Sequence, residues 1–122
     1  MASILFDPTM RGLADALTLH ARRHEVLASN LANVETPGFK AQELDFERAL
    51  RDAFAAERTE NDPADAPAVV EDASAPARPD GNSVDLDLEM AKLAANDGRY
   101  VALAKILDLR IRLLRAAIEG TR

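Results

Sequence analysis

The sequence has no cysteine and no tryptophan among its 122 residues, and it has only one tyrosine and four phenylalanines. The absence of cysteine excludes disulfides and thiolate metal sites. Because aromatic rings are so few, the apolar fraction consists mostly of Ala and Leu, which lose little side-chain freedom in a helical turn. The composition therefore predicts a mainly helical protein.

Long apolar runs are also missing. No stretch approaches the ~18 continuous apolar residues that a membrane-spanning helix needs. The first residues lack the basic region and apolar core of a cleaved secretory signal. We therefore expect that, if the chain leaves the cytoplasm, it does so by a route that needs no cleaved signal.

The net charge of −6 is unevenly distributed. Residues 1–40 hold four basic and four acidic side chains and are balanced. Residues 41–85 hold four basic and twelve acidic side chains, a net charge of −8, and residues 86–122 hold seven and five, a net charge of +2. An acidic chain without a basic stripe is a poor partner for nucleic acid, so no nucleic-acid ligand is expected.

The first segment, residues 1–34, predicts a long helix that begins at Asp7 and Pro8. Asp is a favoured N-cap, and Pro at the first helical position loses no hydrogen bond. Apolar residues then recur in steps of three and four, which indicates a seam against another helix, and His20 and His24 occupy a gap in the middle of that seam. The seam consists of Met10, Leu13, Leu17, Leu27, Leu31 and Val34.

The middle of the chain divides into two parts. Residues 35–56 hold a Thr-Pro-Gly turn and then a short amphipathic helix over 45–56, with Asp45 as its cap. Residues 57–82 carry four of the six prolines among Ala, Asp and Glu, without apolar periodicity. This composition predicts a flexible, irregular acidic linker.

The last segment, residues 83–122, predicts a second long helix from about Asp85 to Gly120. One heptad-like row runs along it, and a second apolar row lies beside the first. Two rows exceed what one partner helix can cover, and large exposed apolar patches usually mark an interface. The two rows are Leu86, Met90, Leu93, Asp97, Tyr100, Ala104, Leu107, Ile111, Leu114 and Ile118, and Leu103, Ile106, Leu109, Leu113 and Ala117. Together the segments predict two long terminal helices that form an antiparallel, coiled-coil-like hairpin.

Few residues suggest chemistry. His20 and His24 share a helical face at a spacing that can bind zinc, but the sequence has no other His and no Cys to complete a site. Contact with a partner helix is therefore the favoured interpretation of both. No nucleophile elbow, P-loop or dinucleotide fingerprint is present. We expect no enzymatic activity, no cofactor, no metal and no small-molecule substrate.

The most specific feature is the run from Ala28 to Lys40. It resembles the N-terminal signature of the flagellar rod and hook protein family, in which Asn-Leu-Ala-Asn is followed by Thr-x-Gly-Phe-Lys. Residues 3–56 and 80–122 share this resemblance, and the short length favours a proximal rod subunit. Residues 57–80 follow no family pattern. The matching residues are Asn30, Ala32, Asn33, Thr36, Gly38, Phe39 and Lys40.

The resemblance implies a structural subunit of the flagellar basal body, placed in the rod that transmits torque across the periplasmic space. It also implies export through the flagellar type III apparatus, and contacts with copies of itself, other rod proteins, the membrane-ring protein and the rod-base adaptor. The alternative function is a cytoplasmic helical export chaperone or regulator of flagellar assembly. The expected assembly interface comprises Leu13, Leu17, Leu27, Leu31, Leu93, Tyr100, Leu103, Leu107, Ile111, Leu114 and Ile118.

Overall fold

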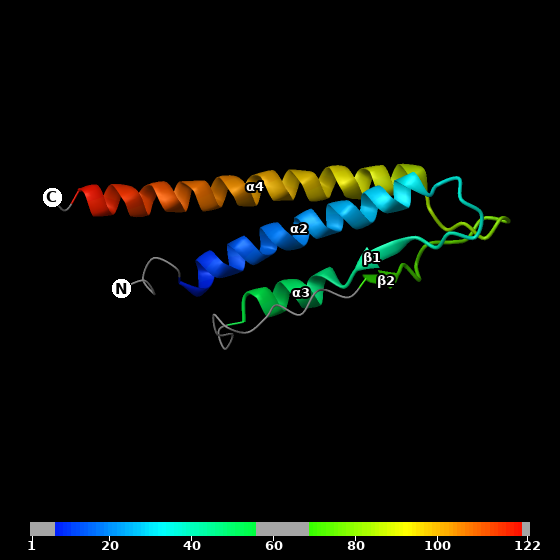
Figure 1. Ribbon diagram of the computed structural model, residues 1–122, viewed down its shortest axis with the longest axis horizontal. Helices are drawn as coiled ribbons and strands as arrows, with labels where there is room; N and C mark the ends of the chain where they lie inside the picture. Colours follow the sequence, from blue (N-terminus) through cyan, green and yellow to red (C-terminus); the bar gives the residue numbers. More distant parts are fainter. Residues whose placement is uncertain (1–6, 56–68, 121–122) are drawn as a thin grey trace.

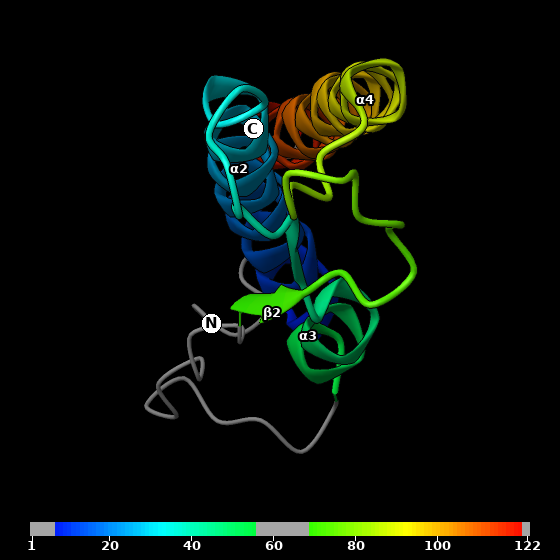
Figure 2. The same cartoon turned by 90° about the vertical axis from the view of Figure 1, so that its right-hand side faces the viewer.

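The computed structural model describes residues 7–55 and 69–120. These residues form helix α2 (Pro8–Ala32), strand β1 (Gln42–Leu44), helix α3 (Phe46–Ala53), strand β2 (Val69–Glu71) and helix α4 (Leu86–Glu119). Helices α2 and α4 lie side by side and run antiparallel, whereas α3 and the strands lie on the other side of α2 (Figure 1, Figure 2). The predicted helical hairpin with a short middle helix is confirmed.

Both ends of α2 are closed by the predicted residues. The side chain of Asp7 accepts a hydrogen bond of 2.8 Å from the backbone N–H of Met10, and Pro8 opens the helix. At the other end, the backbone N–H of Asn33 donates to the carbonyls of Ser29 and Asn30. The Asn33 side chain donates a further hydrogen bond of 2.8 Å to the Ser29 carbonyl. These bonds satisfy backbone groups that a helix end otherwise leaves unpaired.

Helix α4 is longer than its partner, with 34 residues against 25 in α2. Its N-cap Asp85 accepts a hydrogen bond of 3.1 Å from the Leu88 N–H. The helix continues through Gly98 and ends before Gly120, as the predicted range from about Asp85 to Gly120 requires. At about 1.5 Å per residue, α4 is ~51 Å long and α2 ~38 Å long. The last turns of α4 therefore extend past the start of α2 (Figure 1).

The core surrounds α2, because α4 packs on one side of this helix and α3 with β1 packs on the other. Gly12 of α2 is buried beneath the ring of Phe54, and a Cβ at this position would lie only 2.3 Å from a ring carbon. A side chain here would therefore push the end of α3 away from α2. The buried apolar residues are Met10, Leu13, Ala16, Leu19, Leu27, Ala41, Leu44, Ala53 and Val84.

The sequence did not predict the two strands. β1 and β2 pair antiparallel, with Gln42 opposite Glu71 and Leu44 opposite Val69. The expected linker, residues 57–82, therefore contains a strand. Two β-branched valines of β2 pair with the edge of β1, and the four prolines of the linker lie outside the paired residues. Residues 56–68 lie outside the described residues, so the expected flexibility there stays a prediction.

Candidate assembly surfaces

One end of the hairpin is closed by hydrogen bonds between two segments that are far apart in the sequence. We call residues 33–41 the signature turn and residues 78–85 the return segment. The Gly38 N–H donates to the Asp80 carbonyl at 2.9 Å, and the Ser83 N–H donates to the Phe39 carbonyl at 3.0 Å. The Ala41 N–H donates to the Ser83 hydroxyl at 2.8 Å. The start of α4 is thereby fixed against the end of α2.

Asn82 carries most of this contact. Its side chain is fully buried, and its amide donates to the carbonyls of Asn33, Val34 and Thr36 at 2.8 to 3.1 Å. Its side-chain oxygen accepts a hydrogen bond of 2.7 Å from the Val84 N–H. One side chain thus satisfies carbonyls that the end of α2 leaves without helical partners.

Two glycines allow the segments to approach each other. Gly38 has φ +77° and Gly81 has φ +84°, a backbone conformation that other residues rarely adopt. A Cβ on Gly81 would also lie 3.3 Å from the Gly38 Cα. The Lys40 ammonium donates to the Gly81 carbonyl at 2.6 Å. Gly38 and Lys40 of the signature therefore serve the closure of this turn.

Asn30, the first signature residue, is buried where α2, β1 and α4 meet. Its amide donates to the Gln42 carbonyl at 2.8 Å and to the Glu89 carboxylate at 2.9 Å. Its oxygen accepts a hydrogen bond of 2.9 Å from the Gln42 N–H. Asn30 thus pairs with both backbone groups of Gln42, as a residue of a neighbouring strand would. The same side chain also binds the carboxylate of Glu89, which is only 1% exposed.

A charged cluster surrounds Glu89 and joins four parts of the chain. Lys92 lies 3.4 Å from the Glu89 carboxylate, 3.0 Å from Asp72 and 3.8 Å from Glu43. Arg23 of α2 holds Glu43 by two hydrogen bonds of 2.9 and 3.1 Å. A buried carboxylate is costly unless it is paired, and Lys92 and Asn30 are the partners of Glu89.

The same cluster changes two ionisation equilibria. Hydrogen bonds from Ser74 hold the pKa of the Asp72 carboxyl below its ordinary value, against a smaller opposing effect of burial, and Lys92 lowers it further. Partial burial lowers the pKa of Lys92, but the hydrogen bond to Asp72 and the negative charges of Glu89, Asp72 and Glu43 together raise it above its ordinary value. Both groups are therefore held in their charged forms.

Midway along the hairpin the two histidines of α2 contact α4. His20 is buried, its Nδ1 lies 2.8 Å from the Asn96 side-chain oxygen, and the Asn96 amide donates to the His20 carbonyl at 2.9 Å. His24 is more exposed, and its Nδ1 lies 2.8 Å from the Asp97 carboxylate. Both histidines thus contact the partner helix, as the favoured interpretation predicts. Among the described residues, no cluster of three or more His, Cys, Asp or Glu could hold a metal ion.

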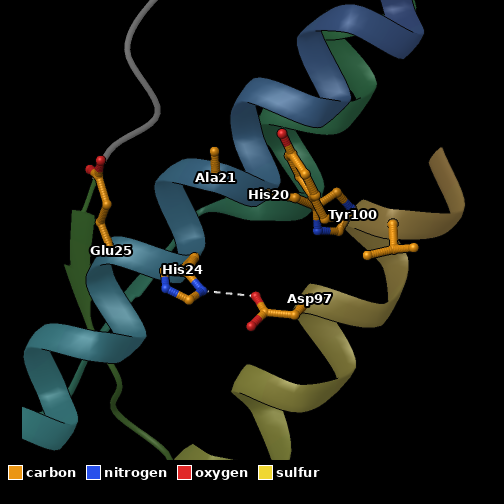
Figure 3. Close-up of a pocket in the computed structure, with 7 residues that line it drawn as sticks. His20, Ala21, His24, Glu25, Asp97 and Tyr100 are labelled. Atoms are coloured by element: carbon orange, nitrogen blue, oxygen red, sulfur yellow. Dashed lines mark hydrogen bonds and ion pairs between the residues drawn. The ribbon is translucent and has the colours of Figure 1, made fainter. Parts of the chain in front are cut away.

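A pocket of about 430 Å³ opens at this midpoint between α2 and α4. Figure 3 shows His24 turned toward Asp97 across the pocket, His20 beside Tyr100, and Glu25 at the rim with its carboxylate directed outward. The lining residues are His20, Ala21, His24, Glu25, Asp97, Tyr100 and Val101. The pocket therefore combines an apolar floor with two carboxylates.

The expected assembly residues fall into three groups. Leu13 and Leu27 are buried in the core of the single chain, at 8% and 0% exposure. These two side chains already serve the chain's own fold. Half-buried positions are Leu17, Leu31, Leu93, Leu103, Leu107 and Leu114, and the exposed positions are Tyr100, Ile111 and Ile118.

The second apolar row of α4 is the most exposed. Ile106, Leu109 and Leu113 are exposed by 52%, 58% and 62%. Near the same end, Arg110 forms an ion pair with Asp7, the N-cap of α2. The hydrogen bond from the Met10 N–H, aided by the charge of Arg110, lowers the pKa of the Asp7 carboxyl. The last turns of α4 extend beyond the start of α2 (Figure 1).

Sequence reasoning missed the buried polar residues that position these surfaces, Asn82, Glu89 and Asn96. Each occurs in a helix or turn pattern that is also common on exposed surfaces. The one usable signal was Gly81 before Asn82, which is typical of a tight turn. None of the helices that the structure describes has the length and apolarity of a membrane span.

Comparisons with known proteins agree with this architecture. A family model described as flagella basal body rod protein matches residues 10–40, which contain α2 and the signature turn. The flagellar basal body rod protein FlgB of Escherichia coli is 35% identical, with 93% of this chain and 95% of the relative covered. FlgB of Salmonella typhimurium is 32% identical with the same coverage. FlgB of Bacillus subtilis is 28% identical over 95% of this chain and 97% of its own.

Proposed function

Because this chain belongs to the FlgB family of flagellar basal body rod proteins, we propose that it assembles by helix contacts with copies of itself and with neighbouring rod subunits. Its role in the basal body is that of a structural rod component for motility, and it is not an enzyme. The other partners implied by the family are the membrane-ring protein and the rod-base adaptor.

The observation that carries the proposal is the apolar surface of α4. The row of Ile106, Leu109 and Leu113 and the exposed side chains Ile111 and Ile118 lie on a helix whose last turns pass beyond α2. Burial of apolar area contributes roughly 25 cal/mol per Å² to association. Contacts between identical subunits that do not close on themselves produce helical growth, as a rod requires.

Export belongs to the same proposal. We infer that the chain reaches the periplasmic space through the flagellar type III apparatus without cleavage of a signal, and that the exposed apolar face of α4 is covered only in the rod. The exposed α4 surface supports this order of events, because a single copy leaves it in water. The linker range 57–82 acts as a connector between α3 and α4.

A localisation experiment tests the proposal. A tagged chain is expressed in a strain that lacks its own copy, and basal bodies are purified from the membrane fraction. We expect restored swimming and the tagged chain, at its full length, in the purified basal bodies. The alternative, a cytoplasmic export chaperone or regulator, predicts that swimming is restored while the chain is found only in the soluble fraction.

A further inference from the structure

The pocket at the midpoint of the hairpin has the features of a receptor for a cationic side chain. Asp97 lies within it beside His24, and Glu25 stands at the rim with a side chain that is 72% exposed. Ala21, Val101 and the ring of Tyr100 supply the apolar walls. The Asp97 carboxylate on the same pocket lining as the Tyr100 ring favours a guanidinium, which combines ion pairing with stacking. Glu25, 3.9 Å from Arg22, adds negative charge at the rim.

A matching cationic surface exists elsewhere on the same chain. Lys105 and Arg112 are seven residues apart on α4, so they share one side of the helix, and they border the exposed row of Ile106, Leu109 and Leu113. The Arg112 side chain is 72% exposed and pairs only with Asp108, one turn earlier, among the described residues. Exposed pairs of this kind contribute little to stability, so Arg112 can exchange its partner at small cost.

We propose that the pocket between α2 and α4 of one copy receives Arg112 from α4 of a second copy, with Leu109 and Leu113 covering Ala21 and Val101. The proposal rests on the proposed function and names the surface through which copies meet. The guanidinium pairs with Asp97 inside the pocket while Glu25 adds negative charge at the rim, and the apolar row leaves water at the same time. The acidic pocket and the cationic row are thus two halves of one contact.

This contact forms only between copies. Arg112 lies fifteen residues beyond Asp97, and at about 1.5 Å per residue the two are ~22 Å apart along one straight helix. Donor and receptor surfaces are different parts of the chain, so each copy uses both, and the contact does not close after two copies. A growing row of subunits follows from the geometry.

Crosslinking tests the proposal directly, because the chain has no cysteine of its own. The variant with Glu25→Cys and Arg112→Cys is expressed in the strain that lacks its own copy, and basal bodies are purified and oxidised. The two positions are too far apart for a disulfide within one chain. We expect a non-reducing gel to show dimers and larger multiples that reducing agent converts to monomer. The matched control replaces Arg51, an exposed arginine of α3, together with Glu25 and gives monomer only.

A charge exchange supplies the second measurement. Glu25→Arg or Arg112→Glu alone reduces swimming, and the two changes together restore it, whereas Arg51→Glu does not restore the Glu25→Arg strain. Purified basal bodies that contain the double-cysteine chain only as monomer, with no rescue by the charge exchange, overturn the contact. That result does not contradict the proposed function. The proposed function fails only if the chain is absent from the basal bodies. Crosslinks to a different rod protein in place of multiples of this chain also overturn it.

Discussion

The two ends of the helical hairpin differ in which kind of side chain they bury. At the end formed by the signature turn and the return segment, polar side chains are buried and hydrogen-bonded, and Asn30, Asn82 and Glu89 are each at most 1% exposed. At the far end of α4, apolar side chains are exposed, with Leu113 at 62%. The usual distribution of polar and apolar residues is inverted at both ends.

This inversion separates folding from assembly. Buried amides and carboxylates demand specific partners, so they fix how α2, β1 and α4 meet within one chain. Apolar side chains have no such directional demand, and they gain by burial against any complementary surface. The closed end therefore determines the hairpin, and the open end provides a surface for other subunits. The four predictions below test this division through the free energy of unfolding of the single chain, from the largest change to the smallest.

The largest loss is expected for Asn30→Asp. The change removes the two amide donors and places a second carboxyl group against the buried side chain of Glu89. An uncompensated buried charge costs about 4 kcal/mol of unfolding free energy. Chemical denaturation followed by circular dichroism measures the change.

Ser29→Asp is the control, since it adds the same charge at the neighbouring exposed position of α2. We expect this variant to unfold within about 0.5 kcal/mol of the unchanged chain. Equal losses in the two variants would mean that added negative charge near the end of α2, and not the buried pairing of Asn30, causes the effect.

Asn82→Ala should cost somewhat less, about 3 kcal/mol. The substitution removes one of the donors to three carbonyls of the α2 end and signature turn, and it leaves the Val84 N–H without its acceptor. Water entering the turn recovers part of the loss. The midpoint of urea unfolding reports it, with Gln42→Ala, an exposed side chain on β1, as the matched control. A midpoint that Asn82→Ala leaves unchanged would show that the return segment does not hold the hairpin closed.

The sequence predicts features of the hairpin that depend on neighbouring residues, and it misses those that depend on residues far away along the chain. Asp7, Pro8, Asp85 and Gly120 act locally, and these helix ends were predicted from them because a cap needs only its own neighbours. The exposed row on α4 was predicted from spacing alone. The partners that Asn82 and Glu89 find on the signature turn and on α2 lie tens of residues away along the chain, and no local pattern identifies them. β2 was missed for the same reason, since its pairing partner is β1 and its own three residues carry little signal.

A smaller effect is expected in how the unfolding free energy depends on acidic pH. The pKa of the Asp72 carboxyl lies below its ordinary value of 3.8, first because of the hydrogen bonds from Ser74 and then because of Lys92. These contacts of the carboxylate therefore stabilise the fold fully above that pH, and their contribution is lost as the pH falls through the lowered value. Lys92 has a raised pKa, so its contribution persists up to about its ordinary value and disappears only at more alkaline pH. Asp72→Asn should therefore reduce the drop in unfolding free energy between pH 6 and pH 3 by about 1 kcal/mol. Urea titrations at several pH values test this, with Asp52→Asn on the exposed face of α3 as the control. Identical pH profiles for Asp72→Asn and the unchanged chain would remove Asp72 from the acid response.

The smallest change in stability is expected at the open end, and there it should accompany loss of function. Leu113 is 62% exposed, so Leu113→Asp buries no charge in the single chain and should alter its unfolding free energy by no more than about 0.5 kcal/mol. In the rod the same aspartate would be placed against an apolar or acidic surface of a neighbouring subunit, where an unpaired charge is costly to bury. We expect normal expression, an unchanged denaturation curve and no swimming on soft agar.

Arg115→Asp, an exposed change elsewhere on the same turn of α4, controls for added negative charge and should leave motility closer to normal. If Leu113→Asp swims normally, the exposed row does not face another subunit, and the assembly surface must lie on the side of α4 that carries Tyr100, Ile111 and Ile118.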